Sequence, residues 1–102
     1  MKIPGKFTIN SQEITIELVD TLPNQRFGEY CCITDKIKVA TNVKDDDGTV
    51  IPLKEEQIEN TFWHELLHVF QWHSKGSFSE EESSTYAGYL LEFFKSSGLI
   101  IK

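Results

Sequence analysis

The stretch TFWHELLHVFQWH, residues 61–73, decides how the second half of the chain folds and carries its strongest chemical motif. It contains the pattern HExxH, with His64 and His68 four residues apart and Glu65 directly after the first histidine. On an α-helix, residues with this spacing lie about 40° apart on one face, so both imidazoles can reach one ion. Glu65 can then sit beside the site without binding the ion. Because five residues can match by chance, the surrounding residues must separate a metal-binding helix from an ordinary core helix.

The apolar residues of this stretch surround most of the predicted helix, which runs from about residue 54 to residue 73. They lie away from the histidine pair on a helical wheel: Ile58, Phe62, Trp63, Leu66, Leu67, Val69 and Phe70. A helix that is apolar around most of its circumference is buried. Its polar stripe holds His64, His68 and Gln71, and buried histidines need partners, either a zinc ion or ordinary hydrogen bonds. His73 lies opposite the pair, so we expect it to interact with the helix C-terminus and not with the same ion.

A third ligand is expected from a neighbouring element, since a catalytic zinc site usually has three protein ligands and one open position. Residues 79–96 follow a short turn that ends the first helix at Gly76, and they are predicted to form a second, antiparallel helix. One face of that helix, interpreted as its packing face, carries Glu82, Tyr86, Tyr89 and Phe93. Glu81 falls on the solvent face, and Glu80 is expected to precede the regular helix.

Glu82 is therefore the predicted third ligand, because an acid on a packing face needs a partner. The spacing from Ser79 to Glu82 also matches a capping box, in which the glutamate only returns to the N-cap amide. The sequence leaves both interpretations open.

The first half of the chain reads as β-strands. Residues 6–20 predict two strands around a turn at residues 10–12, and residues 29–34 and 36–41 predict two more around Asp35. Residues 42–52 are expected to form a turn or exposed loop, whose three aspartates lack calcium-loop spacing. The prediction is an α+β fold: a small antiparallel sheet of three to four strands followed by two antiparallel helices, in one domain over residues 1–102.

Composition excludes several classes of protein. The formal charge of −6 argues against nucleic acid or an anionic membrane as a partner. The chain shows no long apolar run and no signal-peptide core at its start, so a cytoplasmic location is expected. Cys31 and Cys32 are adjacent, which would strain a disulfide and does not suit a zinc site. We expect one half-buried and one exposed thiol.

In two segments, HELLH and ESSTYAGYLL (residues 82–91), the sequence resembles the ImmA/IrrE-like family of small HExxH zinc metallopeptidases. That family pairs its HExxH helix with a downstream helix of the form E-A-N-x-F-A-x-x-L-L. Glu82 matches the glutamate of that pattern, Tyr86 its phenylalanine and Ala87 its alanine. Ser83-Ser84 replaces Ala-Asn, and Leu67 stands where the family usually has glycine.

The resemblance implies a zincin-like fold and a Zn²⁺-dependent enzyme that hydrolyses a peptide bond. His64, His68 and Glu82 would hold the ion, and Glu65 would act as general base toward a zinc-bound water. The candidates for an additional donor to the oxyanion are Tyr30, Tyr86 and Tyr89.

The predicted partner is a peptide or protein substrate, which could add as a strand to an exposed edge near Lys36–Thr41. A protein partner other than the substrate is a further candidate. Two alternatives remain at the level of sequence. In one, zinc only joins the helices of a non-catalytic binding or regulatory module. In the other, the chain is a metal-free interaction module and HELLH is a coincidence.

Overall fold

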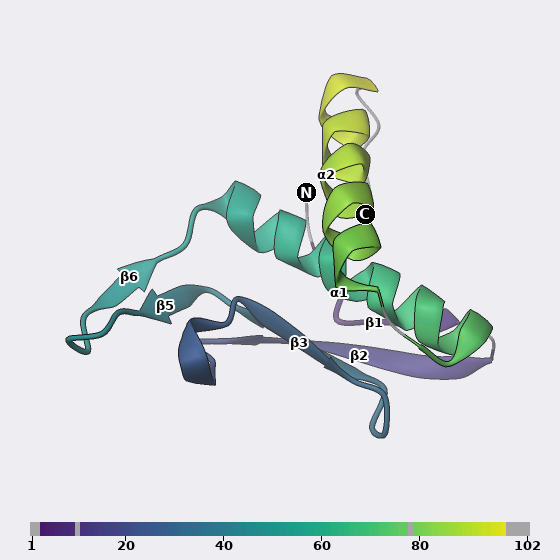
Figure 1. Cartoon of the computed structure of the whole chain (residues 1–102), viewed down its shortest axis with the longest axis horizontal. Helices are drawn as coiled ribbons and strands as arrows, with labels where there is room; N and C mark the ends of the chain where they lie inside the picture. The colour runs from purple at the N-terminus through teal and green to yellow at the C-terminus, as the bar shows by residue number, and fades with distance from the viewer. Residues whose placement is uncertain (1–2, 10, 78, 98–102) are drawn as a thin grey trace.

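The computed structural model describes residues 3–9, 11–77 and 79–97 (Figure 1). Its elements are β1 (Lys6–Ile9), β2 (Gln12–Val19), a 3₁₀ turn (Pro23–Gln25), β3 (Gly28–Cys31), β4 (Lys36–Ala40), β5 (Asn42–Lys44), β6 (Val50–Pro52), α1 (Glu55–Lys75) and α2 (Glu80–Ser97). The predicted α+β class, with strands first and two helices last, is confirmed.

The main sheet has the strand order β1-β2-β4-β3. The β1–β2 and β3–β4 pairs are antiparallel, as the two predicted hairpins require. The central pair, β2 with β4, is parallel, with Ile16 opposite Ile37. The sheet is therefore mixed and not purely antiparallel. This arrangement follows from the way the second hairpin docks, because the chain crosses from β2 to the far edge and returns through β4.

This strand order corrects the predicted peptide-binding edge. β4 pairs with β2 on one side and with β3 on the other, so residues Lys36–Thr41 do not offer a free edge. The strand at the edge of the sheet beside α1 is β3, which contacts that helix. A peptide that adds to the sheet next to α1 must therefore pair with β3.

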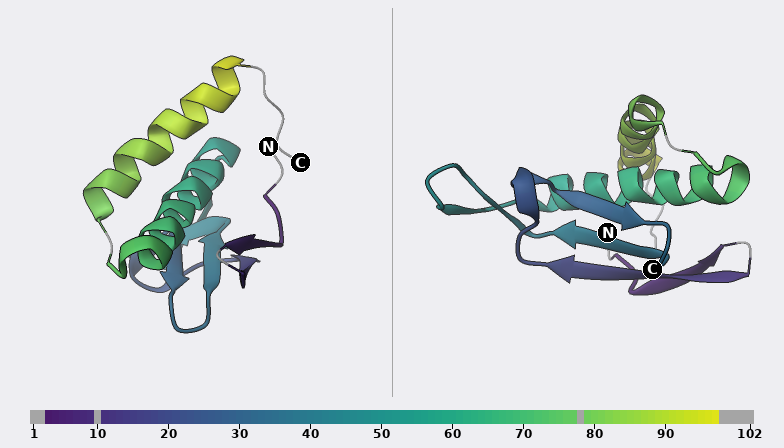
Figure 2. Two further views of the ribbon diagram at one scale, coloured as in Figure 1. Left: turned by 90° about the vertical axis from the view of Figure 1, so that its right-hand side faces the viewer. Right: turned by 60° about the horizontal axis from the view of Figure 1, so that its bottom comes forward.

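α1 lies across one face of the sheet and is covered on its other side by α2 (Figure 2). The shared core takes Ile14, Ile37 and Val39 from the sheet, Phe62, Trp63, Leu66 and Val69 from α1, and Ala87 and Leu91 from α2. Each such large side chain contributes about 1.5–3 kcal/mol when it is fully buried. The predicted burial of α1 is confirmed, with Phe70 as an exposed exception.

The helix ends have local causes. The backbone N–H of Lys54 donates to Oε1 of Gln57 at 2.8 Å, which anchors the start of α1. Gly76 ends the helix in the left-handed conformation, with φ 69°, and its N–H donates to the carbonyl of Trp72. This confirms the predicted stop. α2 then turns back and runs beside α1 in the opposite direction, as predicted, inclined to it in the view of Figure 1 (Figures 1 and 2).

Residues 42–52 form a β-hairpin where a turn or loop was expected. β5 and β6 pair around an acidic turn that projects from one end of the molecule (Figure 1). Oδ1 of Asp45 accepts the N–H of Asp47 at 3.1 Å, and Oδ1 of Asp47 accepts the N–H of Thr49 at 2.8 Å. The aspartates thus cap their own turn, as Asp side chains commonly do.

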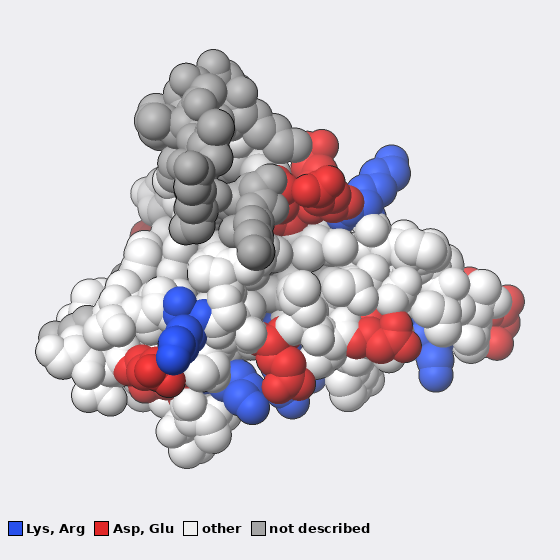
Figure 3. Space-filling model, turned by 180° about the vertical axis from the view of Figure 1, so that it is seen from behind, with Lys and Arg blue, Asp and Glu red and all other residues white. Residues whose placement is uncertain are grey.

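The surface carries mixed charge. On the face shown in Figure 3, lysine and arginine side chains are interspersed with aspartate and glutamate. Within the described ranges, α1 and α2 both lack the apolar length needed to cross a bilayer. Cys31 is exposed, Cys32 is partly buried, and both are free thiols, as the sequence predicted.

Candidate metal centre

α1 brings His64 and His68 together on one side of the helix. Their Nε2 atoms lie 3.0 Å apart, and the ring centroids are separated by 4.7 Å. His68 is buried and His64 is partly exposed. The predicted pairing of the motif histidines is therefore present, with both Nε2 atoms directed at one point.

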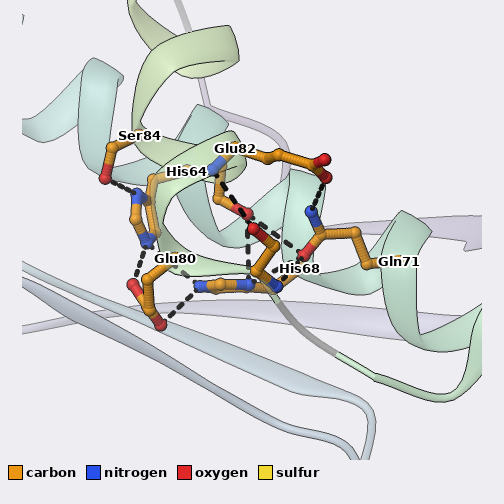
Figure 4. A network of polar contacts seen from close by, with 8 residues as sticks. His64, His68, Gln71, Glu80, Glu82 and Ser84 are labelled. Carbon is orange, nitrogen blue, oxygen red and sulfur yellow. Dashed lines mark hydrogen bonds and ion pairs between the residues drawn. The ribbon is translucent and has the colours of Figure 1, made fainter.

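Glu80, the first residue of α2, completes this group. Its Oε2 lies 2.9 Å from Nε2 of His64, and its Oε1 lies 2.9 Å from Nε2 of His68 (Figure 4). The carboxylate therefore bridges the two imidazoles. The Glu80 side chain is 77% exposed, so the group is open to solvent on this side.

This geometry corrects the predicted placement of Glu82. Oε2 of Glu82 instead accepts a hydrogen bond from Nε2 of Gln71 at 3.5 Å, away from the bridged pair (Figure 4). The N–H of Glu82 donates to Oγ of Ser79 at 3.3 Å, which is one half of the capping box that the sequence suggested. The N–H of Ser79 donates to Oε1 of Gln71 at 3.0 Å, so Gln71 is a partner of the N-cap amide.

The reason lies in which face of α2 packs on α1. Among the side chains of α2 that the structure describes, Ser83, Ala87 and Leu91 are buried, whereas Tyr86 is 51% exposed. Small residues let two helix backbones approach closely, so the face of Ser83 and Ala87 packs on α1. Glu80 lies on the same face, one turn before Ser83, because α2 already begins at that residue. The spacing of small residues from Ser83 to Ala87 was the sequence signal for Glu80.

Polar groups on both helices hold the outer nitrogens of the two histidines. Oγ of Ser84 lies 3.2 Å from Nδ1 of His64. Nδ1 of His68 lies 3.2 Å from Oγ of Ser83 and 3.3 Å from Oε1 of Gln71. Such outer contacts orient the imidazole of a metal ligand, so that the other nitrogen faces the ion.

Glu65 lies close to the pair and is only 6% exposed. One of its carboxylate oxygens and one nitrogen from each of His64 and His68 lie within 4.8 Å of one another. Burial raises the pKa of Glu65 to about 8, with smaller contributions from the negative charges of Glu80 and Glu29. A buried carboxyl group beside two imidazoles is a candidate for proton transfer.

The donor set fits a divalent ion such as zinc. Tetrahedral ligands at ordinary Zn–N distances are separated by about 3.3 Å. The separations among His64 Nε2, His68 Nε2 and the Glu80 oxygens, 2.9–3.0 Å, are close to that value. Imidazole nitrogen and carboxylate oxygen are also the ligand types that catalytic zinc sites use.

A cleft of about 570 Å³ runs between β3 and α1 and includes this group. Its lining includes Gly28 and Tyr30 of β3, Thr61, His64 and Glu65 of α1, and Glu80 of α2. A volume of this size lies within the range of ordinary ligand pockets. The contribution of Gly28 is its missing side chain, since a Cβ there would lie 2.5 Å from Cγ2 of Thr61.

The three tyrosines predicted as oxyanion donors have different positions. Tyr30 lines the cleft, but its hydroxyl donates to Oδ1 of Asp35. Burial is the larger cause that raises the pKa of Tyr30, and the hydrogen bond to Asp35 raises it further. Among the described residues that line the cleft, Tyr86 does not occur. The side chain of Tyr89 lies outside the described residues.

Nε2 of His73 is 3.1 Å from Oδ1 of Asp35, so His73 is separate from the metal group, as the wheel predicted.

Comparison with protein-family models, curated proteins and solved structures finds no match to this chain. The resemblance to the ImmA/IrrE-like family therefore stays a prediction. Any inference about function depends on the geometry of His64, His68, Glu80 and Glu65.

Proposed function

We propose that this chain is a zinc-dependent metallopeptidase that hydrolyses a peptide bond. His64, His68 and Glu80 would hold the ion, and Glu65 would act as general base. The observation that carries the proposal is the convergence of two imidazole nitrogens and one carboxylate, 2.9–3.0 Å from one another, within a solvent-open cleft. A buried fourth group, Glu65, stands beside them without being needed as a ligand.

Zinc at this site would supply a Lewis acid that polarises the scissile carbonyl and activates a water molecule. Glu65 carries out the proton transfers. A neighbouring cation lowers the pKa of a carboxyl group, so Glu65 would be ionised and able to accept a proton from the attacking water. It then gives this proton to the leaving amine nitrogen, and the peptide is split into a carboxylic acid and an amine.

The proposed substrate is an extended peptide segment that adds to the edge of the sheet at β3. An edge strand offers unpaired backbone N–H and C=O groups, which bind a peptide main chain without regard to its sequence. β3 forms one wall of the cleft, opposite His64 and Glu65. A strand bound there would pass its backbone in front of the histidines.

Two observations favour catalysis over a zinc ion that only joins the helices. A structural zinc site is normally closed by four protein ligands. Here Glu80 is largely exposed and the group opens into the cleft. A structural site also gains nothing from Glu65, whose burial is costly when the carboxylate is charged.

Metal analysis of protein purified without added zinc tests the site. We expect about one zinc per chain, lost in His64→Ala and in His68→Ala. Glu80→Gln and Glu82→Gln form a matched pair, because both remove one charge from the first turn of α2. Zinc affinity should fall in Glu80→Gln and persist in Glu82→Gln; the opposite pattern would make Glu82 the ligand, and no zinc in the wild type would remove the proposal.

Hydrolysis requires a separate measurement. A mixed-sequence peptide library, incubated with zinc-loaded protein and read by mass spectrometry, should show cleavage that stops in Glu65→Gln. That variant should still bind zinc, since Glu65 is not a proposed ligand. Zinc binding without any cleavage in the wild type would favour the non-catalytic module.

A further inference from the structure

The side-chain amide of Gln71 lies where α1 meets the start of α2 (Figure 4). Its Oε1 is within hydrogen-bond distance of three groups: the backbone N–H of Ser79 at 3.0 Å, Oγ of Ser83 at 3.2 Å and Nδ1 of His68 at 3.3 Å. Its Nε2 faces Oε2 of Glu82 at 3.5 Å. One amide oxygen therefore connects a metal-site histidine with the first turn of the next helix.

The direction of these hydrogen bonds follows from the backbone. The N–H of Ser79 can only donate, so the atom of Gln71 that faces it must be the carbonyl oxygen. Rotating the amide by 180° would place its NH₂ group against the N–H of Ser79, donor against donor. It would also turn the amide oxygen toward the carboxylate of Glu82, acceptor against acceptor. An amide oxygen is only an acceptor, so Nδ1 of His68 must carry a proton to bond with it.

That proton decides what the other side of the His68 ring presents. A neutral imidazole with its proton on Nδ1 has a lone pair on Nε2, the atom that faces His64 and Glu80. The carboxylate of Glu80 is only an acceptor, so a proton or a metal ion must lie between its oxygen and this lone pair. Ser83 supports the same arrangement, because its hydroxyl donates to Gln71 and has lone pairs left for Nδ1 of His68. His68 is thereby prepared to bind a cation through Nε2.

The same oxygen also holds the backbone next to a second ligand. Ser79 precedes Glu80 directly, so its hydrogen bond to Gln71 fixes the point from which the Glu80 side chain extends. We propose that Gln71 is a positioning residue that acts on two of the three zinc ligands. It fixes the tautomer of His68 and the location of Glu80. This inference rests on the proposed metal site and adds a residue outside it.

His64 provides an internal contrast. Its outer nitrogen faces only the hydroxyl of Ser84 among the hydrogen bonds described for it, and a hydroxyl can donate or accept. Ser84 therefore does not dictate the tautomer of His64. Loss of Ser84 should affect zinc binding less than loss of Gln71.

The first test replaces the amide of Gln71 by groups of similar length. Gln71→Met keeps the shape and removes the acceptor, and we expect it to weaken zinc binding about 10- to 100-fold in a chelator competition assay. The double variant Gln71→Glu with Glu82→Gln exchanges the two groups and keeps an acceptor oxygen at position 71. It should recover most of the affinity. Ser84→Ala is the matched control, with a smaller loss, and wild-type affinity in Gln71→Met would overturn the proposal.

The second test reads the tautomer without metal. In metal-free Glu80→Ala protein at mildly alkaline pH, in which the Glu80 carboxylate no longer faces Nε2 of His68, ¹⁵N NMR of the imidazoles should find the His68 proton on Nδ1. Adding Gln71→Met should shift that proton toward Nε2. A His68 proton on Nε2 in Glu80→Ala would overturn the proposal even if Gln71→Met failed to fold. If the tautomer is as expected but the wild type binds no zinc, the proposed function is removed, together with the positioning role of Gln71 toward the ion.

Discussion

Replacing Gly28 by alanine tests the close approach of β3 to α1 that forms the cleft. A Cβ at this position would meet Cγ2 of Thr61 at 2.5 Å, the backbone oxygen of Lys38 at 3.2 Å and Cγ of Glu65 at 3.3 Å. Ordinary carbon–carbon contacts lie at about 3.5–4.0 Å. The strand and the helix must therefore separate by about 1 Å for the methyl group to fit.

Overpacking of this kind costs about 1–3 kcal/mol in a well-packed interior. We expect Gly28→Ala to lower the free energy of unfolding by about 2 kcal/mol, because the shortest contact is to a buried side chain on a rigid helix. Chemical denaturation followed by far-UV circular dichroism measures this change. Gly88→Ala on α2 is the control, since nothing lies within 4 Å of its Cβ. That change should stabilise the helix by about 0.5–1 kcal/mol.

A double-mutant cycle identifies the contact responsible. Thr61→Ser removes Cγ2 and retains the hydroxyl that donates to the carbonyl of Gln57 at 2.8 Å. In that background Gly28→Ala should cost at least about 1 kcal/mol less, the size of coupling expected for touching residues. Some cost should persist, because the oxygen of Lys38 is backbone and cannot move away. An equal cost of Gly28→Ala in the wild type and in the Thr61→Ser background would refute the steric explanation.

Three further predictions concern charge, turn geometry and metal. In metal-free protein, the raised pKa of Glu65, about 8 against an ordinary 4.5, means that its contribution to stability is fully present below about pH 4.5 and is lost as the pH rises through 8. Between about pH 5 and pH 7, the free energy of unfolding of the wild type in urea should therefore fall by on the order of 2 kcal/mol relative to that of Glu65→Gln. Parallel pH profiles of the two proteins would contradict this. Asp35→Ala removes the acceptor of Tyr30 and His73 and leaves alanine at φ 50°, so it should cost about 2 kcal/mol in thermal unfolding, and a cost no larger than that of the exposed Asp46→Ala would count against it. Zinc at a hundredfold excess over its Kd should stabilise the folded chain by about 2.7 kcal/mol in calorimetry, reversibly with chelator; an equal response in His64→Ala would show that zinc acts elsewhere.

Local sequence signals predicted most of the elements. Turn residues marked the hairpin around residues 10–12, and Gly76 marked the end of α1, because each depends on only a few neighbouring residues. The order in which strands pair depends on contacts far apart in the sequence. The position of β4 between β2 and β3 was therefore not predicted, and the peptide-binding edge was assigned to the wrong strand.

The candidate site divides in the same way. The pairing of His64 and His68 follows from the geometry of a single helix, and the structure has it. The third member depends on which face of α2 meets α1. Hydrophobicity favoured the face of Tyr86 and hence Glu82, whereas close helix packing selected the small residues Ser83 and Ala87 and brought Glu80 to the histidines.

β3 has a consequence for how the protein behaves at high concentration. An edge strand that accepts a peptide can also pair with the same strand of a second copy, which would cover both clefts at once. Two features of β3 limit such self-association: it is only four residues long, and it carries the charged Glu29. A short edge strand with an acidic residue leaves the sheet free to bind a peptide transiently and makes a stable dimer of two copies unfavourable.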